Sequence, residues 1–312
     1  MGRDEPSRHL GLDLGATNLK WASLEQRGDA WTVLDRGQIA TRGEDGADAV
    51  IGRMGDLVQQ ARGEWPGIVT VGVGVPGLYD AAAGVATFLP NLPTDWAGQP
   101  VAAPMRARLG LPVSLINDAR AFGLAELRLG AGRGCRAMVG LTLGSGVGGV
   151  VVLGGAVHFG HAGTGGELGH QTLLPDGPAC TCGNRGCLEA LTKADAVAAA
   201  CGTATAEEAV SKARAGDRRA LDGLAEIGRW LGIGIANLVV VLTPDRVVIG
   251  GGVSGAGELL LTPIRAEVHR RVHVTNLDAV EIVTAELGTW AGAIGAGVHG
   301  AEAAVVTALG PR

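Results

Sequence analysis

Four side chains with metal-binding chemistry fall within residues 170–187. His170, Cys180, Cys182 and Cys187 lie on a stretch rich in glycine and proline turns. Three thiolates and one imidazole match the ligand set of a closed, tetrahedral zinc site. The alternatives are two structural thiols beside an unrelated histidine, or a disulfide, which a cytosolic location disfavours. Because the chain has only five cysteines and three of them cluster here, zinc is favoured, with a structural role.

Two glycine-rich turns have the composition of phosphate-binding loops. Residues 13–18 read Asp-Leu-Gly-Ala-Thr-Asn, and residues 141–149 read Leu-Thr-Leu-Gly-Ser-Gly-Val-Gly-Gly. Glycine lets the backbone turn tightly, so that successive N–H groups point one way and form a concave anion site. The first segment is predicted to be strand, turn and strand. Two such turns far apart predict a duplicated architecture with a cleft between its halves.

The pattern Gly-x-Gly-x-x-Gly occurs at residues 72–77, 144–149 and 250–255. A dinucleotide-binding fingerprint requires a strand before the pattern and a helix after it. Only residues 250–255 are predicted to have that context, and they lie far from the N-terminus. The sequence also contains no Walker A lysine motif. Phosphate binding is therefore expected from backbone N–H groups rather than from a P-loop.

Asn117 and Asp118 stand where a predicted strand ends and a helix begins. Either residue could serve as the helix cap, or Asp118 could act as a general base at the mouth of an α/β cleft. The spacing alone does not decide between these functions. Glu167 and Glu189 flank the cysteine segment, where they are either surface carboxylates or groups that orient a polyol.

Alternating strands and helices must position these groups, and this alternation predicts an α/β fold. Strands are expected within residues 9–42, at 68–75, 112–116, 246–249 and 280–284, and on both sides of the second glycine turn. Helices are expected at residues 45–65, 99–109, 118–129, 188–201, 206–215, 217–242, from about 257, and at 288–309.

The composition excludes several kinds of partner. The net charge is −5 and no basic tract occurs, so nucleic acid and anionic membranes are not expected as partners. No apolar segment precedes Leu10, so a secretory signal is not expected. Residues 137–157 are uncharged and long enough to span a bilayer, but their glycines and β-branched residues favour strands over a membrane helix. A cytoplasmic protein is expected.

Short motifs spread over nearly the whole chain resemble the ROK family of bacterial sugar kinases and sugar-responsive repressors. They are residues 13–18, 74–77, 90–93, 117–118, 143–149, 167–170 and 180–189. The resemblance implies an actin/hexokinase-like duplicated fold with two lobes around a cleft. It implies a small N-terminal α/β lobe at residues 1–116, to which a helix at 298–312 returns. The large α/β lobe would be residues 117–297, with the zinc loop at 170–187.

The resemblance also implies roles for individual residues. Asp118 is similar to the catalytic base, and His170 to a residue that binds zinc through one ring nitrogen and a sugar hydroxyl through the other. Asp13 is similar to a carboxylate that helps to hold Mg²⁺. The implied sugar ligands are Asn91, Asn117, Asp118, Glu167, His170 and Glu189. The implied nucleotide-binding residues are Asp13, Gly15, Thr17, Asn18, Gly144, Ser145, Gly146, Gly250, Gly251 and Gly252.

Four residues depart from the family pattern. Ala16 and Ser145 replace the more usual glycine and threonine, and both are small, so ATP binding is still expected. Arg120 and Phe122 replace small residues after Asp118, where they are expected to affect packing between the lobes.

The activity implied by the resemblance is ATP-dependent phosphorylation of the 6-hydroxyl of a hexose, with glucose as the expected substrate. The expected cofactors are ATP, catalytic Mg²⁺ and structural Zn²⁺, and the family suggests a homodimer. Alternatives are a kinase for N-acetylmannosamine, fructose or allose, a glucokinase that uses polyphosphate, and a non-catalytic sugar-binding regulator. Only eight residues precede the first predicted strand, so a helix-turn-helix domain is not expected.

Overall fold

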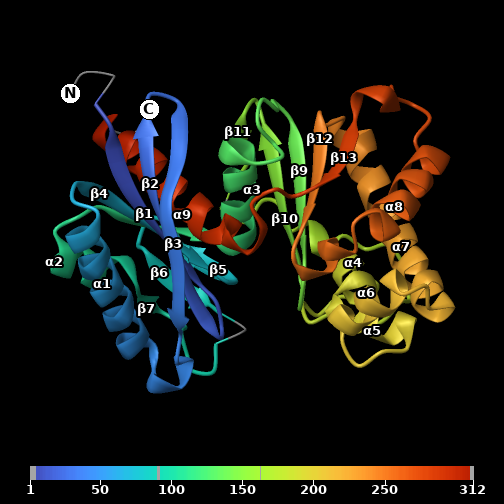
Figure 1. Ribbon diagram of the computed structural model, residues 1–312, viewed down its shortest axis with the longest axis horizontal. Helices are drawn as coiled ribbons and strands as arrows, with labels where there is room; N and C mark the ends of the chain where they lie inside the picture. Colours follow the sequence, from blue (N-terminus) through green and yellow to red (C-terminus); the bar gives the residue numbers. More distant parts are fainter. Residues whose placement is uncertain (1–4, 90–91, 162, 310–312) are drawn as a thin grey trace. The chain divides into compact units, whose positions relative to one another are not determined.

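Two five-stranded sheets, one in each of two units, form the framework of the chain (Figure 1). The computed structural model describes residues 5–89, 92–161 and 163–309, with side chains as far as residue 306. Unit 1 comprises Met1–Leu129 and Trp290–Arg312, and unit 2 comprises Gly130–Thr289. The chain therefore leaves unit 1 and returns to it with its last helix.

The sheet of unit 1 combines an antiparallel and a parallel half. Its strands are β1 (Ser7–Leu14), β2 (Asn18–Arg27), β3 (Ala30–Ala40), β4 (Ile68–Val75) and β8 (Val113–Asn117). The order is β3-β2-β1-β4-β8. The first three strands pair antiparallel, whereas β4 and β8 continue parallel to β1. Because β1 and β8 run in the same direction, Asp13 and Asn117 both lie near the carboxyl edge of this sheet.

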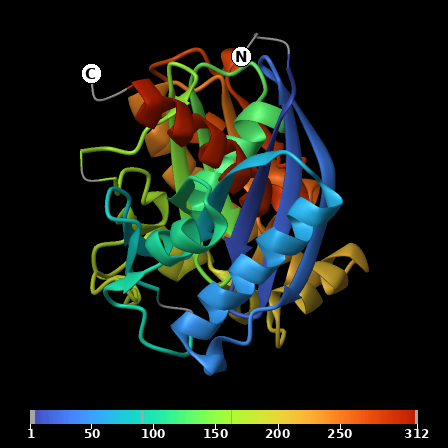
Figure 2. The ribbon, with the colours of Figure 1, turned by 90° about the vertical axis from the view of Figure 1, so that its left-hand side faces the viewer.

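The two faces of this sheet carry different side chains. Alternate residues Leu10, Leu12 and Leu14 of β1 are buried in one core with the apolar face of helix α1 (Ala47–Glu64), which includes Val50 and Met54. Figure 2 views unit 1 from the side of α1. This face is therefore an ordinary hydrophobic core.

Glycines on the opposite face allow helix α9 (Ala291–Leu309) to approach closely. A β-carbon at Gly11 would lie 1.8 Å from the carbonyl oxygen of Ala293, and one at Gly72 would lie 1.7 Å from that of Ala296. No larger residue fits at either position unless the helix moves. The small residues of α9 are thus explained by backbone contact with β1 and β4.

The remaining elements of unit 1 flank the sheet. Helix α2 (Ala102–Leu109) precedes β8, and helix α3 (Asp118–Leu129) follows it directly. A small sheet has the order β5-β6-β7. Its strands are β5 (Leu78–Asp80), β6 (Val85–Phe88) and β7 (Gln99–Pro100).

Unit 2 repeats the sheet of unit 1. Its strands are β9 (Met138–Leu143), β10 (Val147–Leu153), β11 (Ala156–Val157), β12 (Arg246–Gly250) and β13 (Glu281–Thr284). The order is β11-β10-β9-β12-β13, again with three antiparallel strands followed by two parallel ones. The two glycine turns occupy equivalent places in the two sheets: the first joins β1 to β2, and the second joins β9 to β10. The duplicated architecture predicted from those turns is confirmed.

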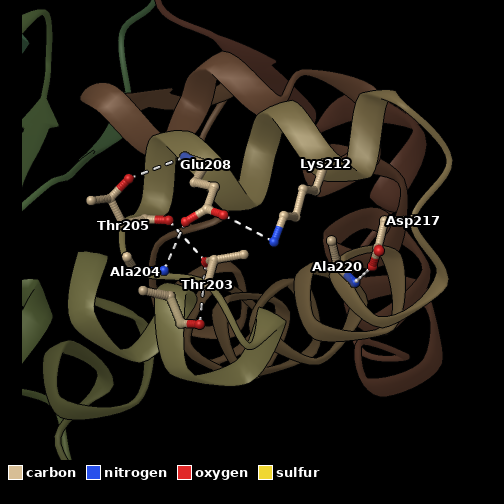
Figure 3. A network of polar contacts seen from close by, with 8 residues as sticks. Thr203, Ala204, Thr205, Glu208, Lys212, Asp217 and Ala220 are labelled. Carbon is tan, nitrogen blue, oxygen red and sulfur yellow. Dashed lines mark hydrogen bonds and ion pairs between the residues drawn. The ribbon is translucent and has the colours of Figure 1, made fainter.

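Helices fill the connection between the two halves of the second sheet. They are α4 (Leu188–Thr192), α5 (Ala194–Cys201), α6 (Ala206–Arg214), α7 (Arg218–Leu242) and, between β12 and β13, α8 (Glu258–Arg271). Figure 3 shows how α6 and α7 begin. Thr205 Oγ1 accepts a hydrogen bond from the N–H of Glu208, and Glu208 Oε2 accepts one from the N–H of Ala204. Asp217 caps α7 in the same way as Thr205 caps α6.

Helix α7 is long and apolar enough to cross a bilayer by length and composition, but half of its apolar window is buried inside unit 2, as in a core helix. Residues 137–157, the other apolar stretch, contain β9, β10 and β11. The prediction of strands there is confirmed.

The structure differs from the sequence prediction at several boundaries. Residues 188–201 form two helices because Lys193 is extended, with φ −64° and ψ 166°. The predicted lobe boundary at 116/117 also differs from the compact units, which place α3 and all of α9 in unit 1. These two helices pack backbone to backbone, since a β-carbon at Gly295 would lie 1.7 Å from the carbonyl oxygen of Ala121.

Candidate functional site

Asn117 and Asp118 occupy the junction between β8 and α3. Asn117 is buried, and its Oδ1 accepts hydrogen bonds from the N–H groups of Ala119 (3.1 Å) and Arg120 (3.3 Å). Its Nδ2 donates to the carbonyl of Gly77 at 3.2 Å. Asp118 is exposed in the first turn of α3. Asp118 Oδ1 also accepts a hydrogen bond from the N–H of Ala119, at 2.8 Å. Asn117 therefore caps the helix, and the neighbouring Asp118 is the exposed carboxylate at this junction.

Two further side chains surround this junction. Burial raises the pKa of Tyr79, and the charge of Arg120 together with a hydrogen bond from the Asn117 backbone lowers it in part. Arg120 itself is almost fully buried. No sequence pattern singles out Tyr79, because its position beside Asn117 depends on the pairing of β5 within the small sheet.

The first glycine turn is fixed by hydrogen bonds that its carbonyl groups accept. Thr41 Oγ1 donates to the carbonyl of Gly15 at 2.7 Å, and the N–H of Thr41 donates to the carbonyl of Thr17 at 2.9 Å. The N–H of Gly15 closes the turn by donating to the carbonyl of Asn18. Among the described residues, the N–H groups of Ala16 and Thr17 donate to no other group, and both residues are exposed. These amides can therefore bind an anion.

Asp13 lies at the end of β1 on the face that packs against α9. A β-carbon at Gly292, in the first turn of α9, would come within 2.7 Å of its Oδ2. Burial raises the pKa of Asp13, and the charge of Lys20 opposes that shift. A carboxylate in this position offers the oxygen ligand that Mg²⁺ prefers.

The second glycine turn, residues 144–146, is closed by a hydrogen bond from the N–H of Gly144 to the carbonyl of Gly146 at 2.9 Å. Ser145 is exposed at its tip. Gly251 packs beside it, because a β-carbon there would lie 2.3 Å from the carbonyl oxygen of Leu143. Gly251 also has a positive φ of 84°, which favours glycine. The turn and the expected nucleotide loop at 250–252 are therefore neighbours within unit 2.

The predicted zinc ligands are brought together in unit 2. Their candidate ligand atoms all lie within 4.8 Å of one another. Cys180 Sγ is 3.6 Å from His170 Nδ1, and Cys182 Sγ is 3.8 Å from Cys187 Sγ. Zinc–sulfur bonds of about 2.3 Å at a tetrahedral angle place two sulfurs about 3.8 Å apart, and a zinc–nitrogen bond of about 2.1 Å gives about 3.6 Å. The donor set and its spacing therefore fit Zn²⁺.

The pKa values of the cysteines in this cluster are shifted in both directions. Burial and the neighbouring thiols raise the pKa of Cys187 to about 12, whereas a hydrogen bond from the Asn184 backbone lowers the pKa of Cys182. A thiol such as Cys187 ionises readily only when a bound metal stabilises its thiolate. All three cluster cysteines are free thiols, so the disulfide alternative is not seen among them.

Glu189 connects the metal cluster to the second glycine turn. Its Oε2 accepts a hydrogen bond from the N–H of Val147 at 2.9 Å, and its Oε1 accepts one from Thr181 Oγ1 at 3.2 Å. The family resemblance implies that Glu189 is a sugar ligand, but nothing in the sequence indicates its contact with Val147. That contact joins positions 42 residues apart in the chain, and no local pattern encodes it.

The expected ligands divide between the units. Asn117 and Asp118 belong to unit 1, whereas Glu167, His170 and Glu189 belong to unit 2. Glu167 is exposed and precedes a short 3-10 helix, Leu168–His170, whose last residue points its Nδ1 to the metal cluster. Asn91 lies outside the described residues.

The chain is similar to sugar kinases over nearly its whole length. The ROK family matches residues 9–299. A glucokinase from Thermotoga maritima is 35% identical over 306 residues, which cover 92% of this chain and 95% of that protein. A ROK hexokinase from Thermus thermophilus has a TM-score of 0.82 at 35% identity and covers 96% of this chain and 99% of its own. A ROK family glucokinase from Streptomyces griseus, in complex with glucose and AMPPNP, has a TM-score of 0.77 at 30% identity and covers 95% and 100%.

Repressors are also among the relatives. A putative xylose repressor from Caldicellulosiruptor sp. is 29% identical over 297 residues, which cover 89% of this chain and 74% of that protein. These similarities confirm the α/β, actin/hexokinase-like duplicated fold predicted from the motifs. This chain belongs to the ROK family.

Proposed function

We propose that this chain is a hexose kinase that transfers the terminal phosphoryl group of ATP to the 6-hydroxyl of glucose. Its similarity to glucokinases supports a sugar kinase, and the complex of the Streptomyces griseus enzyme with glucose and AMPPNP supports this substrate pair. The observation in this chain that carries the proposal is Asp118, an exposed carboxylate in the first turn of α3 whose helix is capped by another residue. A protein that only binds sugar has no need of a base there.

In the proposed reaction, Asp118 accepts the proton of the 6-hydroxyl as that oxygen attacks the γ-phosphorus of ATP, and the bond from this phosphorus to the bridging oxygen breaks so that ADP leaves. The amides of Ala16 and Thr17 and the turn at residues 144–146 are assigned to the phosphate oxygens, and Asp13 is assigned to help hold Mg²⁺. When bound, Mg²⁺ neutralises charge on the transferred phosphoryl group. The loop at 250–252 is assigned to the adenosine side of ATP.

The proposed sugar ligands are Asn91, Asn117, Asp118, Glu167, His170 and Glu189. Zn²⁺ is proposed as a structural ion held by His170, Cys180, Cys182 and Cys187. Because His170 faces the cluster through Nδ1, its Nε2 is assigned to a sugar hydroxyl.

A non-catalytic sugar-responsive regulator is the second candidate, because xylose repressors share 26–29% identity with this chain. Both candidates bind sugar, but only the kinase releases ADP. A cytoplasmic homodimer is also proposed, by analogy with the family.

The decisive experiment is an ADP-release assay with MgATP and a panel of glucose, N-acetylmannosamine, fructose and allose. We expect glucose to give the highest kcat/KM and 6-deoxyglucose to give no ADP above the sugar-free rate. Formation of glucose 6-phosphate identifies the acceptor hydroxyl. Faster turnover of another hexose would replace glucose as the substrate, and polyphosphate in place of ATP tests the alternative donor. No ADP release with any sugar would favour the regulator.

A further inference from the structure

We propose that Glu189 is a positioning residue that couples zinc binding to nucleotide binding within unit 2. The metal segment is defined as residues 168–187, from the start of the 3-10 helix to the last zinc ligand. In this proposal the metal segment acts through Glu189 to hold the second glycine turn in the conformation that binds phosphate. The inference rests on the proposed function, because it takes the turn at 144–146 to be a phosphate site. It adds a second role for Glu189 beside that of a sugar ligand.

One carboxylate oxygen of Glu189 contacts the second glycine turn. Oε2 accepts the hydrogen bond from the N–H of Val147, the first residue of β10, at 2.9 Å. The same oxygen fills the space that a side chain at Gly146 would occupy, since a β-carbon there would lie 2.6 Å away. Glu189 therefore contacts the turn at two successive residues, where the glycines supply no side-chain packing of their own.

The other carboxylate oxygen of Glu189 contacts the metal segment. Oε1 accepts a hydrogen bond from Thr181 Oγ1 at 3.2 Å and lies 3.6 Å from Cys180 Sγ. Glu189 is also only two residues from Cys187, in the first turn of α4. Since the metal fixes Cys180 and Cys187 relative to each other, it also fixes the carboxylate between them.

The metal segment also contacts Val147 of β10 through its backbone. A β-carbon at Gly169 would lie 2.0 Å from the carbonyl oxygen of Val147, so the backbone before His170 packs directly on it. In addition, the N–H of Ala194 donates to the carbonyl of Gly144 at 2.8 Å. Val147 is thus held through its N–H by Glu189 and packed at its carbonyl by the segment that carries His170.

The charge of Glu189 opposes phosphate binding, so its contribution must come from geometry. A negative carboxylate beside Gly146 repels a phosphate group, but its hydrogen bond orders the backbone of the turn. Glutamine can accept the same hydrogen bond from Val147 without the charge. The proposal therefore predicts that Glu189→Gln preserves nucleotide affinity and Glu189→Ala does not.

The test is calorimetric titration of ADP with Mg²⁺ into the zinc-loaded, full-length protein in the absence of sugar. Glu189→Ala is expected to weaken ADP binding about tenfold, the effect of losing one hydrogen bond to a charged group. Glu189→Gln is expected to stay within about threefold of wild type, and Thr181→Val, which removes only the contact on the metal side, to give an intermediate loss. Glu208→Ala is the matched control, because Glu208 also accepts a backbone N–H in unit 2.

Zinc removal by a chelator supplies the second arm of the test. It should weaken ADP binding to wild type by about the same factor as Glu189→Ala, and it should add little in the Glu189→Ala variant. Unchanged ADP affinity in Glu189→Ala, or an equal loss on zinc removal in both proteins, would overturn the coupling and leave the kinase proposal intact. If wild type binds no ADP, both the coupling and the kinase proposal are wrong.

Discussion

Asp13 and Gly292 are in direct contact. Gly292 is the second residue of α9, and a β-carbon added to it would lie only 2.7 Å from Asp13 Oδ2. The last helix of the chain therefore shapes the position of a carboxylate at the start of the chain. Since Asp13 is proposed to hold Mg²⁺ in the kinase reaction, a methyl group at position 292 should displace it.

Gly292→Ala is expected to lower kcat/KM for MgATP by on the order of tenfold to a hundredfold, because small misplacements of a catalytic group are costly. Steady-state kinetics with MgATP varied would measure this. Gly52→Ala, in α1, is the matched control: it also places alanine at a helical glycine, but nothing lies within 4 Å of its β-carbon. The control should gain about 0.5–1 kcal/mol of stability and keep its activity. Normal kinetics in Gly292→Ala would argue against a role for Asp13.

Asp118→Asn tests the proposed base. Because Asn117 caps α3 with its own side chain, the fold should survive with a melting temperature close to that of wild type. Turnover should fall by at least about a hundredfold, since asparagine cannot accept the hydroxyl proton. The control is Asp222→Asn at an exposed aspartate of α7, which should leave kcat unchanged. Near-normal kcat in Asp118→Asn would contradict general-base catalysis by this residue.

Much of this arrangement could be predicted from local sequence patterns. The apolar runs before residues 13 and 144 and the β-branched residues around them predicted strands on either side of both glycine turns, and the sheets confirm this. The clustered cysteines predicted a metal site whose ligand atoms the structure brings together. In each case the deciding information lies within about twenty residues, where periodicity and turn chemistry are reliable guides.

The relationships that could not be predicted join distant parts of the chain. The contact of Glu189 with Val147 and that of Gly292 with Asp13 depend on how a helix packs on a sheet strand, and neither partner has a local signature. The interruption at Lys193 was missed because the surrounding alanines have high helix propensity. The lobe boundary depends on the packing of Gly295 against Ala121, which only the assembled helices reveal.

Cys182→Ser tests the zinc site with little effect on packing. Cys182 is exposed, so its sulfur contributes little to the hydrophobic core and its loss should act through the metal. Metal analysis of dialysed wild type is expected to give about one zinc per chain, and the variant should bind zinc at least tenfold more weakly, as outer-shell changes alone cost about that much. Cys135→Ser, at a buried cysteine outside the cluster, should retain the zinc. Zinc well below one per chain in wild type would refute the assignment.

The stability of unit 1 should depend on pH through His9. Its Nδ1 lies 2.7 Å from Thr70 Oγ1 and its Nε2 lies 2.9 Å from Ser7 Oγ, and burial lowers its pKa to about 4 from a normal value of 6.5. The unfolded chain therefore takes up a proton between pH 6.5 and 4 that the folded chain does not. The contribution of His9 is complete above pH 6.5 and is lost as the pH falls towards 4.

Between pH 7.5 and 5 this loss should amount to about 2 kcal/mol from His9. His299 should add to it, because burial lowers its pKa to about 4 as well. Urea unfolding at the two pH values would measure the effect. His9→Gln can still hydrogen-bond but cannot titrate, so its stability should fall by about 2 kcal/mol less than that of wild type over this range. The exposed His158→Gln control should behave like wild type. Equal pH dependence in wild type and His9→Gln would show that His9 remains accessible to protons in the folded protein.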